Sequence, residues 1–311
     1  MQSWVRMKQG HQVHLVIITE AELQRIDQGS AIAKAKQQSA WNREPNLGQS
    51  FCEMNYQEAC IHLHLVIPTK ENSKGDVHYQ ILVWEEMFVI ISDDNRIADM
   101  ALQLLNKTDA CLQNEQQKER TERTVLSIFL ENWFLLALKD DLEYLQTKEL
   151  QIAKMEELIL EGKCPEFNTK MLPVKKQLAR FFRYYNQLLS MEQEMASEKI
   201  AFFTEADMEW LECFRDRCNL LAQETQFTRE YIMQVQEVYQ SEIEIRQNDV
   251  MKALTMVTTI CFPLSLIAGW YGMNFRYMPE IYSVFGYPIV IAVSVLIVVI
   301  SLIIFKKKKF W

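Results

Sequence analysis

A stripe of small, hydroxyl-bearing and amide side chains, with a few bulky apolar ones, recurs at helical spacing near the C-terminal end of the chain. Such spacing keeps side chains on one face of a helix that packs against copies of itself. Hydroxyl and amide oxygens on that face can line a path for water or a hydrated cation, and the bulky members can form constrictions that exclude water. Plain helix packing is the alternative, because small residues let helices approach and hydroxyls bond to their own backbone. The stripe comprises Asn248, Met251, Leu254, Thr255, Thr258, Phe262, Ser265 and Gly269.

Two uncharged segments must carry and anchor this stripe. Residues 253–275 and 281–305 contain no Asp, Glu, Lys or Arg. A bilayer core needs about 20 apolar residues in a helix, so both segments are long enough to cross it. Basic residues precede the first segment and follow the second, which predicts cytoplasmic N- and C-termini and a very short outer loop. We therefore expect a protein of the cell (inner) membrane with two spans, and the lipid bilayer as a partner.

The remainder of the chain is acidic. Residues 1–250 carry 27 Lys and Arg against 40 Asp and Glu, a net charge of −13, whereas residues 251–311 carry a net charge of +5. An acidic soluble part repels phosphate, so we expect no nucleic-acid partner. Nucleotide-binding loops, nucleophile elbows and HExxH zinc motifs are missing from the sequence, so we expect neither an enzyme nor an organic cofactor.

Residues 1–100 favour a mixed α/β fold. A helical stretch is expected at residues 21–38 and a loop at residues 42–48, where Pro, Gly and Asn occur. Apolar or alternating runs typical of strands occur at residues 11–18, 61–67, 77–84 and 87–92, the last two forming a hairpin around Glu85 and Glu86.

Two imidazoles in this region could bind a metal. His62 and His64 alternate on one strand face, and His14 or His78 on a neighbouring strand could supply a third ligand. An ordinary position on the sheet surface is the favoured interpretation, because no cysteine or carboxylate pattern completes such a site.

From residue 95 onward the chain is expected to be helical. A break is predicted between Gly162 and Pro173, and the helical runs on either side should form an antiparallel pair. Neither Pro nor Gly occurs from Val174 to Phe262, and Thr204 with Asp207 provides a start signal. One helix from about residue 205 to residue 270 would be about 100 Å long, so most of it must project from the membrane as a stalk. A lone helix of that length needs partners, which favours self-association.

The segment Lys252–Glu280 resembles the signature region of the CorA family of magnesium transporters. Gly272, Met273 and Asn274 match the family's Gly-Met-Asn triplet, at the outer end of the first span. The stalk, the two spans, the short outer loop and the basic tail agree with the same family. The resemblance implies a CorA-like, funnel-shaped homopentamer with an α/β cytoplasmic domain, a long helical stalk and two C-terminal transmembrane helices, of which the first lines a central pore.

The implied organisation has six parts. They are a cytoplasmic α/β domain at 1–115, an antiparallel helical region at 116–204, a stalk continuing into the pore-lining helix at 205–275, an outer loop at 276–280, a second transmembrane helix at 281–305 and a basic tail at 306–311.

The resemblance also assigns roles in ion selectivity to Gly272, Met273 and Asn274. Asn274 matches the asparagine whose ring of side-chain carbonyls meets the incoming ion. Mg²⁺ gives up its waters reluctantly, so neutral amide oxygens can hold the hydrated ion through hydrogen bonds. The stripe matches the family's pore-facing positions with two departures, because Ser265 stands where threonine is usual and Phe262 where methionine is usual.

Regulation is implied as well. In the family, intracellular Mg²⁺ binds between neighbouring cytoplasmic domains and closes the pore. Glu237 stands where the family has an aspartate, and Asp76 is a candidate partner, although either carboxylate could be a solvated surface charge. Repetition of an acidic domain around an axis produces repulsion that divalent cations would relieve.

A basic tail ends the chain. Its lysines suit an anchor on anionic lipid and a basic collar around the cytoplasmic mouth of the pore. The collar comprises Lys306, Lys307, Lys308 and Lys309.

The expected function is therefore uptake of Mg²⁺ through a channel-like homopentameric pore that intracellular Mg²⁺ gates, with Co²⁺ and Ni²⁺ as further substrates. A Zn²⁺ transporter of the same superfamily is the nearest alternative. A non-conducting, membrane-anchored coiled-coil sensor is a second alternative, which the polar stripe disfavours because an anchor needs no hydroxyl-rich face.

Overall fold

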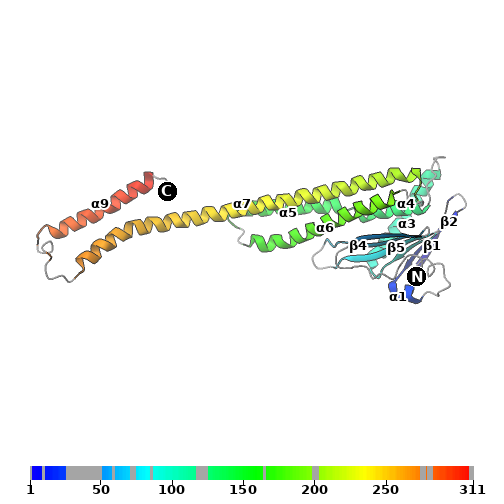
Figure 1. Ribbon diagram of the computed structural model, residues 1–311, viewed down its shortest axis with the longest axis horizontal. Helices are drawn as coiled ribbons and strands as arrows, with labels where there is room; N and C mark the ends of the chain where they lie inside the picture. Colours follow the sequence, from blue (N-terminus) through cyan, green and yellow to red (C-terminus); the bar gives the residue numbers. More distant parts are fainter. Residues whose placement is uncertain are drawn as a thin grey trace. The chain divides into compact units, whose positions relative to one another are not determined.

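The structure is a computed structural model that describes residues 2–8, 11–25, 51–57, 60–70, 75–84, 87–116, 125–163, 166–197, 203–273, 278 and 283–307. The chain divides into two compact units, Met1–Val235 and Gln236–Trp311. The division falls within helix α7 (Glu205–Tyr271), which is continuous through both units (Figure 1). The six-part organisation expected from the sequence stays a prediction.

Six strands of the first unit form one sheet in the order β1-β2-β6-β5-β4-β3. They are β1 (Gln2–Lys8), β2 (His11–Ile18), β3 (Cys52–Gln57), β4 (Cys60–Ile67), β5 (Val77–Trp84) and β6 (Met87–Ile91). β2 and β6 pair in parallel, and the other neighbours pair antiparallel. The strands predicted at 11–18, 61–67, 77–84 and 87–92 are confirmed, as is the hairpin, in which Trp84 pairs with Met87.

A short helix, α1 (Glu20–Arg25), begins the stretch where a helix was predicted at 21–38. Residues 26–38 of that prediction, and the loop predicted at 42–48, lie outside the described residues.

Helices cover one face of the sheet (Figure 1). They are α3 (Asn95–Gln116), α4 (Val125–Ala137), α5 (Asp141–Leu160) and α6 (Phe167–Met195). On α4, the ring centre of Phe129 lies 5.5 Å from that of Phe88 on β6. The indole N–H of Trp133 on α4 donates to the hydroxyl of Tyr79 on β5 at 3.2 Å. All four side chains are buried, so this contact forms part of the core of the first unit.

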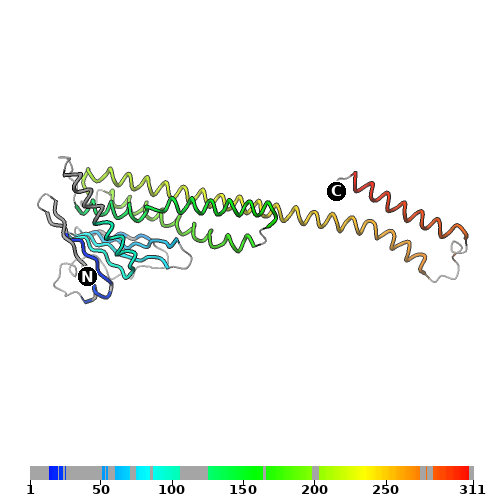
Figure 2. Tube along the Cα trace, turned by 180° about the vertical axis from the view of Figure 1, so that it is seen from behind, coloured from blue at the N-terminus to red at the C-terminus, as the bar shows by residue number. Residues whose placement is uncertain are grey.

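The predicted antiparallel pair is formed by α5 and α6 (Figure 2). The hydroxyl of Tyr185 donates to Asp141 at 3.0 Å, and the rings of Tyr144 and Phe181 are 5.0 Å apart. Residue numbers therefore increase along α5 in the direction in which they decrease along α6, so the two helices are antiparallel. α5 ends at Leu160, and Gly162 follows with a φ of 73°, which suits a residue without a side chain.

The break after α5 is shorter than predicted. α6 begins at Phe167 and contains Pro173, so the expectation that the break extends to Pro173 was wrong. Proline removes only one backbone N–H, and the buried side chains of Met171 and Val174 on either side hold that turn against the core.

The first part of α7 belongs to the first unit. The backbone N–H of Thr204 donates to the carboxylate of Asp207 at 2.9 Å, which confirms the predicted start signal. Buried side chains then recur every three or four residues as far as Val235. Arg215 donates two hydrogen bonds, of 2.9 and 2.7 Å, to the buried carboxylate of Glu192 on α6.

The second unit contains the rest of α7 and α9 (Gly286–Lys307). Both helices are long and apolar enough to cross a membrane. The second predicted span began at residue 281, but α9 begins at Gly286, since residues 283–285 form a turn in which Gly286 donates to the carbonyl of Ser283 at 3.0 Å.

Candidate functional site: the uncharged face of α7

The predicted stripe lies on α7 and is exposed along its whole length. No side chain of residues 236–271, all of which the structure describes, is buried. The bulky members are the most open, with exposed fractions of 74% for Phe262, 58% for Met251 and 56% for Leu254. The stripe is therefore free to face a pore or a neighbouring molecule.

A second stripe on α7 is partly covered. Its residues are Lys252, Met256, Ile260, Pro263, Leu264 and Ile267. At 3.6 residues per turn this covered stripe lies about 150° around the helix from the predicted pore face. The two faces of the span therefore differ in how much of their surface is exposed.

The covered positions of α9 also follow one stripe. Its residues are Gly286, Val290, Ser294, Ile297, Val298, Ser301 and Phe305, of which Ser301 and Phe305 are buried. Figure 1 shows α9 running in the direction opposite to that of α7. The predicted pore face of α7 contains none of the partly covered positions and is bare along its length.

The hydroxyls of the bare face are held by their own helix. Thr255 donates to the carbonyl of Met251 at 2.7 Å, and Thr258 donates to the carbonyl of Leu254 at 3.0 Å. Each hydroxyl oxygen keeps lone pairs that can accept a hydrogen bond from water. The water molecules around a hydrated cation point their hydrogens outward, so the hydroxyl oxygens of this face can accept hydrogen bonds from them without binding the cation tightly.

The outer end of the span carries the predicted selectivity triplet. Gly272 follows the last residue of α7 and donates its N–H to the carbonyl of Ala268 at 2.9 Å. A Cβ at Gly272 would lie 3.0 Å from that oxygen, so glycine suits the close turn there. Met273 is exposed, and Asn274 lies outside the described residues.

The predicted regulatory carboxylates lie in different units. Glu237 is exposed on α7 in the second unit, and Asp76 precedes β5 in the first unit. Asp76 pairs with Arg180 on α6 and accepts the backbone N–H of Thr69 at 3.0 Å. Sequence reasoning missed this arginine, because the two partners are 104 residues apart and no local pattern joins them.

The predicted basic collar is described in part. Lys306 and Lys307 are exposed in the last turn of α9, and Lys308 and Lys309 lie outside the described residues. The two described lysines stand where positive charge complements the C-terminal end of a helix.

The histidines lie close together without forming a metal site. The rings of His64 and His78 are 6.4 Å apart, and His62 shares a hydrogen bond of 3.0 Å with Gln80. Burial, with the nearby His78 and His62, lowers the pKa of His64 to about 4. The expectation of a surface position was wrong for His64, which is 7% exposed. Within the described part of the chain, no three metal-ligating side chains are grouped to hold an ion.

Comparisons with known proteins identify relatives of this chain. The cobalt/magnesium transport protein CorA of Thermotoga maritima is 30% identical over 202 residues, which cover 62% of this chain and 54% of that protein. The magnesium transport protein CorA of Campylobacter jejuni subsp. jejuni is 43% identical over 74 residues, 24% of this chain and 23% of the relative. The chain thus spans about half, or less, of the length of these curated relatives.

The fold is also that of a solved transporter. The complete structure of the CorA magnesium transporter from Methanocaldococcus jannaschii superposes with a TM-score of 0.73 at 20% identity, covering 97% of this chain and 92% of that one. A family model described as CorA-like Mg²⁺ transporter protein matches residues 12–307. The chain therefore belongs to the CorA-like Mg²⁺ transporter protein family.

Proposed function

We propose that this chain forms a homopentameric, channel-like pore that takes up Mg²⁺ across the cell (inner) membrane and that intracellular Mg²⁺ closes. Co²⁺ and Ni²⁺ are further substrates. The observation that carries the proposal is the bare, uncharged face of α7, which contains none of the partly covered positions of that span. The names of the relatives, cobalt/magnesium and magnesium transport proteins, support the choice of ion.

The pore residues act in three ways. Thr255, Thr258 and Ser265 offer oxygens to the hydration shell, and Phe262 with Met251 forms apolar constrictions that close by losing water. At the outer mouth, the amide of Asn274 meets the ion, while Gly272 provides a turn and Met273 provides packing without touching the ion. A neutral amide holds the hydrated ion and releases it faster than a carboxylate would.

The proposal also covers the position of the termini, the regulatory carboxylates and the driving force for transport. Both termini lie in the cytoplasm, with Lys306 to Lys309 forming a basic collar beside the lipid headgroups. Glu237 and Asp76 contribute to cytoplasmic Mg²⁺ binding. The protein is not an enzyme and needs no organic cofactor, since the ion gradient and the membrane potential drive the flux.

Ion uptake by proteoliposomes tests the proposal. The parent should take up Mg²⁺ faster than Zn²⁺, and Asn274→Ala should lower Mg²⁺ uptake by about tenfold or more, the loss typical of a missing polar contact at a selectivity site. Val284→Ala, at an exposed position before α9 and outside both the triplet and the stripe, is the matched control and should retain uptake. Faster Zn²⁺ uptake would assign the Zn²⁺ alternative, and no uptake by a correctly inserted parent would favour the non-conducting sensor.

A further inference from the structure

One face of α6 carries positive charge, although residues 1–250 have a net charge of −13. Residues 167–191 of this helix contain neither Asp nor Glu. Their basic residues are Lys170, Lys175, Lys176, Arg180 and Arg183. Arg180 pairs with Asp76, whereas Lys176 and Arg183 are exposed and form no ion pair with any residue that the structure describes. Lys176 and Arg183, with Ala179 between them, therefore form a basic face that is open to a partner.

An acidic stripe runs along the part of α7 that belongs to the same unit. Its exposed carboxylates are Glu205, Glu209, Glu212, Asp216 and Glu230, and no exposed side chain between residues 205 and 234 is a Lys or Arg. The three arginines of this part, Arg215, Arg217 and Arg229, are partly covered and lie about 80° or more around the helix from the stripe. The two helices of the first unit thus expose opposite charges.

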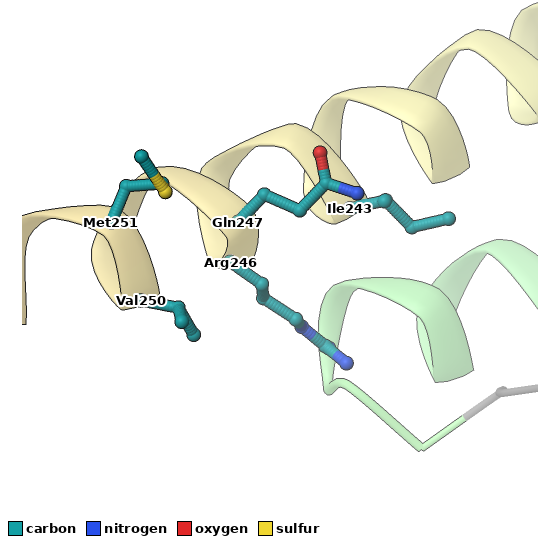
Figure 3. A pocket seen from close by; sticks show the side chains of 5 residues that line it. All are labelled: Ile243, Arg246, Gln247, Val250 and Met251. Atoms are coloured by element: carbon teal, nitrogen blue, oxygen red, sulfur yellow. The ribbon is translucent and has the colours of Figure 1, made fainter. Parts of the chain in front are cut away.

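The groove on α7 just before the first span lacks this separation of charge. Its volume is about 440 Å³, and it is lined by Ile243, Arg246, Gln247, Val250 and Met251. Figure 3 shows the side chains of Arg246 and Val250 leaving one side of the helix and that of Met251 leaving another. Glu242 and Asp249 lie four residues before and three residues after Arg246, on the same side of α7. Both signs of charge meet there, so the groove selects no partner.

Contacts within the first unit fix the height of the basic face along α7. Arg215 donates to Glu192, and the guanidinium of Arg229 lies 4.8 Å from the ring centre of Phe182. Residue numbers therefore decrease along α6 as they increase along α7. Interpolation between the two contacts puts Arg183 at the height of about residue 226 of α7 and Lys176 at that of about residue 233. Glu230 lies between these two heights.

Rotational symmetry brings these heights together between chains. Neighbours in a ring have no displacement along its axis, so residues at one height in one chain meet residues at the same height in the next. With α7 running along that axis, the heights of Arg183 and Glu230 differ by about 6 Å, which a long arginine side chain can span. Asp216 lies about 15 Å from the height of Arg183 and is out of reach. Phe227, 65% exposed on the stripe, can pack beside the small side chain of Ala179.

We propose that the acidic stripe of α7 is covered by the basic face of α6 from a second copy, and that Arg183 of each chain pairs with Glu230 of its neighbour. The proposal rests on the self-association in the proposed function and names a contact between cytoplasmic parts that supports it. Each chain offers both faces, so the contact can repeat around a closed ring. Charge complementarity sets which surfaces meet.

An ion pair within one chain is the competing arrangement. The contacts between α5 and α6 place the exposed Glu143 at the height of Arg183, although the structure records no ion pair between these two described residues. Glu230 accepts a hydrogen bond of 2.7 Å from Gln226 of its own helix through one carboxylate oxygen, which leaves the other oxygen for a cation. Variants that exchange the charges distinguish the two arrangements, because each predicts a different rescuing substitution.

The experiment compares variants of the full chain in detergent, with the fraction of assembled protein measured by light scattering on dilution. Truncation to alanine only removes a weak surface attraction, so the variants reverse charges instead. Arg183→Glu and Glu230→Arg each place like charges at every interface, so each should raise the concentration at half-dissociation by about tenfold or more. The exchange Arg183→Glu with Glu230→Arg should restore it to within about threefold of the parent. Two matched controls, Arg183→Glu with Glu143→Arg and Arg183→Glu with Asp216→Arg, should stay as dissociated as Arg183→Glu alone.

The outcomes separate this contact from the proposed function. Rescue by the Glu230 exchange alone supports the pair and shows that both substitutions are compatible with folding. Rescue by the Glu143 exchange would place the pair within one chain, and rescue by the Asp216 exchange would place it at another height, so either overturns the proposal. Single variants that assemble like the parent, or a loss that no exchange restores, would overturn it as well while leaving the parent's assembly intact. A parent that stays monomeric at every concentration would overturn the pore too.

Discussion

The carboxylate of Asp76 is engaged by two groups of its own chain, the guanidinium of Arg180 and the backbone N–H of Thr69. Gln177, one turn before Arg180 on α6, donates to the carbonyls of Thr69 and Lys70 at 3.1 and 3.0 Å. The chain between β4 and β5 is thus tied to α6 at both of its described ends. A cation at Asp76 must compete with Arg180 for the carboxylate.

Arg180→Ala tests whether Asp76 senses Mg²⁺. Loss of the guanidinium frees one carboxylate oxygen, so we expect the Mg²⁺ concentration that half-inhibits uptake to fall by about threefold, the change given by a modest electrostatic contribution of about 0.6 kcal/mol. Ion uptake at a series of internal Mg²⁺ concentrations measures this. Lys176→Ala, exposed on the same helix, is the control. An unchanged inhibition curve would leave Asp76 as an anchor of the turn alone.

The pair of Glu192 and Arg215 should matter for stability. Glu192 has no exposed surface, whereas the side chain of Arg215 is 40% exposed. Arg215→Ala leaves a buried carboxylate without its cation, and we expect the free energy of unfolding to fall by about 2 kcal/mol, less than for a fully buried pair because solvent screens the arginine. Urea unfolding followed by far-UV circular dichroism measures the loss. Arg183→Ala, on the exposed side of α6, should change the midpoint little.

The long helix was predictable because its signals are local. The absence of Gly and Pro from Val174 to Phe262 and the pairing of Thr204 with Asp207 set its extent and its start. The strands β1 and β3 were missed because they lie at the two edges of the sheet. Edge strands bury less surface, so their sequences carry many polar residues and a weak apolar alternation.

The candidate site was predictable only in part. Helical spacing identified the stripe from Asn248 to Gly269, but it could not show which positions of α7 are partly covered, since that depends on the three-dimensional structure. The partner of Asp76 was hidden for the same reason.

His64 should make the stability of the first unit sensitive to acid. Its pKa is about 4 in the folded protein, lowered first by burial and then by His78 and His62, and about 6.5 when unfolded. The unfolded chain therefore binds the proton more readily, and the free energy of unfolding should fall by about 2–3 kcal/mol as the pH drops from about 6.5 to about 4.

Thermal unfolding at a series of pH values checks the contribution of His64. His64→Gln should flatten the dependence between about pH 4 and pH 6.5, because the replacement does not titrate. His14→Gln, on β2 and outside the histidine cluster, should retain the parent's slope. Equal slopes for the parent and His64→Gln would show that other groups cause the acid sensitivity.

Glu237 is expected to contribute to closure by intracellular Mg²⁺. Glu237→Ala removes one carboxylate from every copy, so the Mg²⁺ concentration for half-inhibition of uptake should rise by about threefold or more, since oxygen ligands supply most of the affinity for a hard cation. Glu242→Ala, which removes a nearby carboxylate from a different side of α7, should leave it unchanged. If both variants shift inhibition equally, the general negative charge of the stalk acts and no specific site exists.

Phe262 should limit the flux if the bare face of α7 lines the pore. Its ring is 74% exposed on that face, and a ring of such side chains narrows the path and excludes water. Phe262→Ala should therefore raise the rate of Mg²⁺ uptake by about threefold to tenfold, a change expected when an apolar constriction is widened. Ile289→Ala is the control, because Ile289 is 58% exposed on α9 and lies outside its covered stripe. A lipid-facing position in a transporter tolerates such a truncation without a change in rate, so equal rates for the two variants would place Phe262 in the lipid and move the pore to another face of α7.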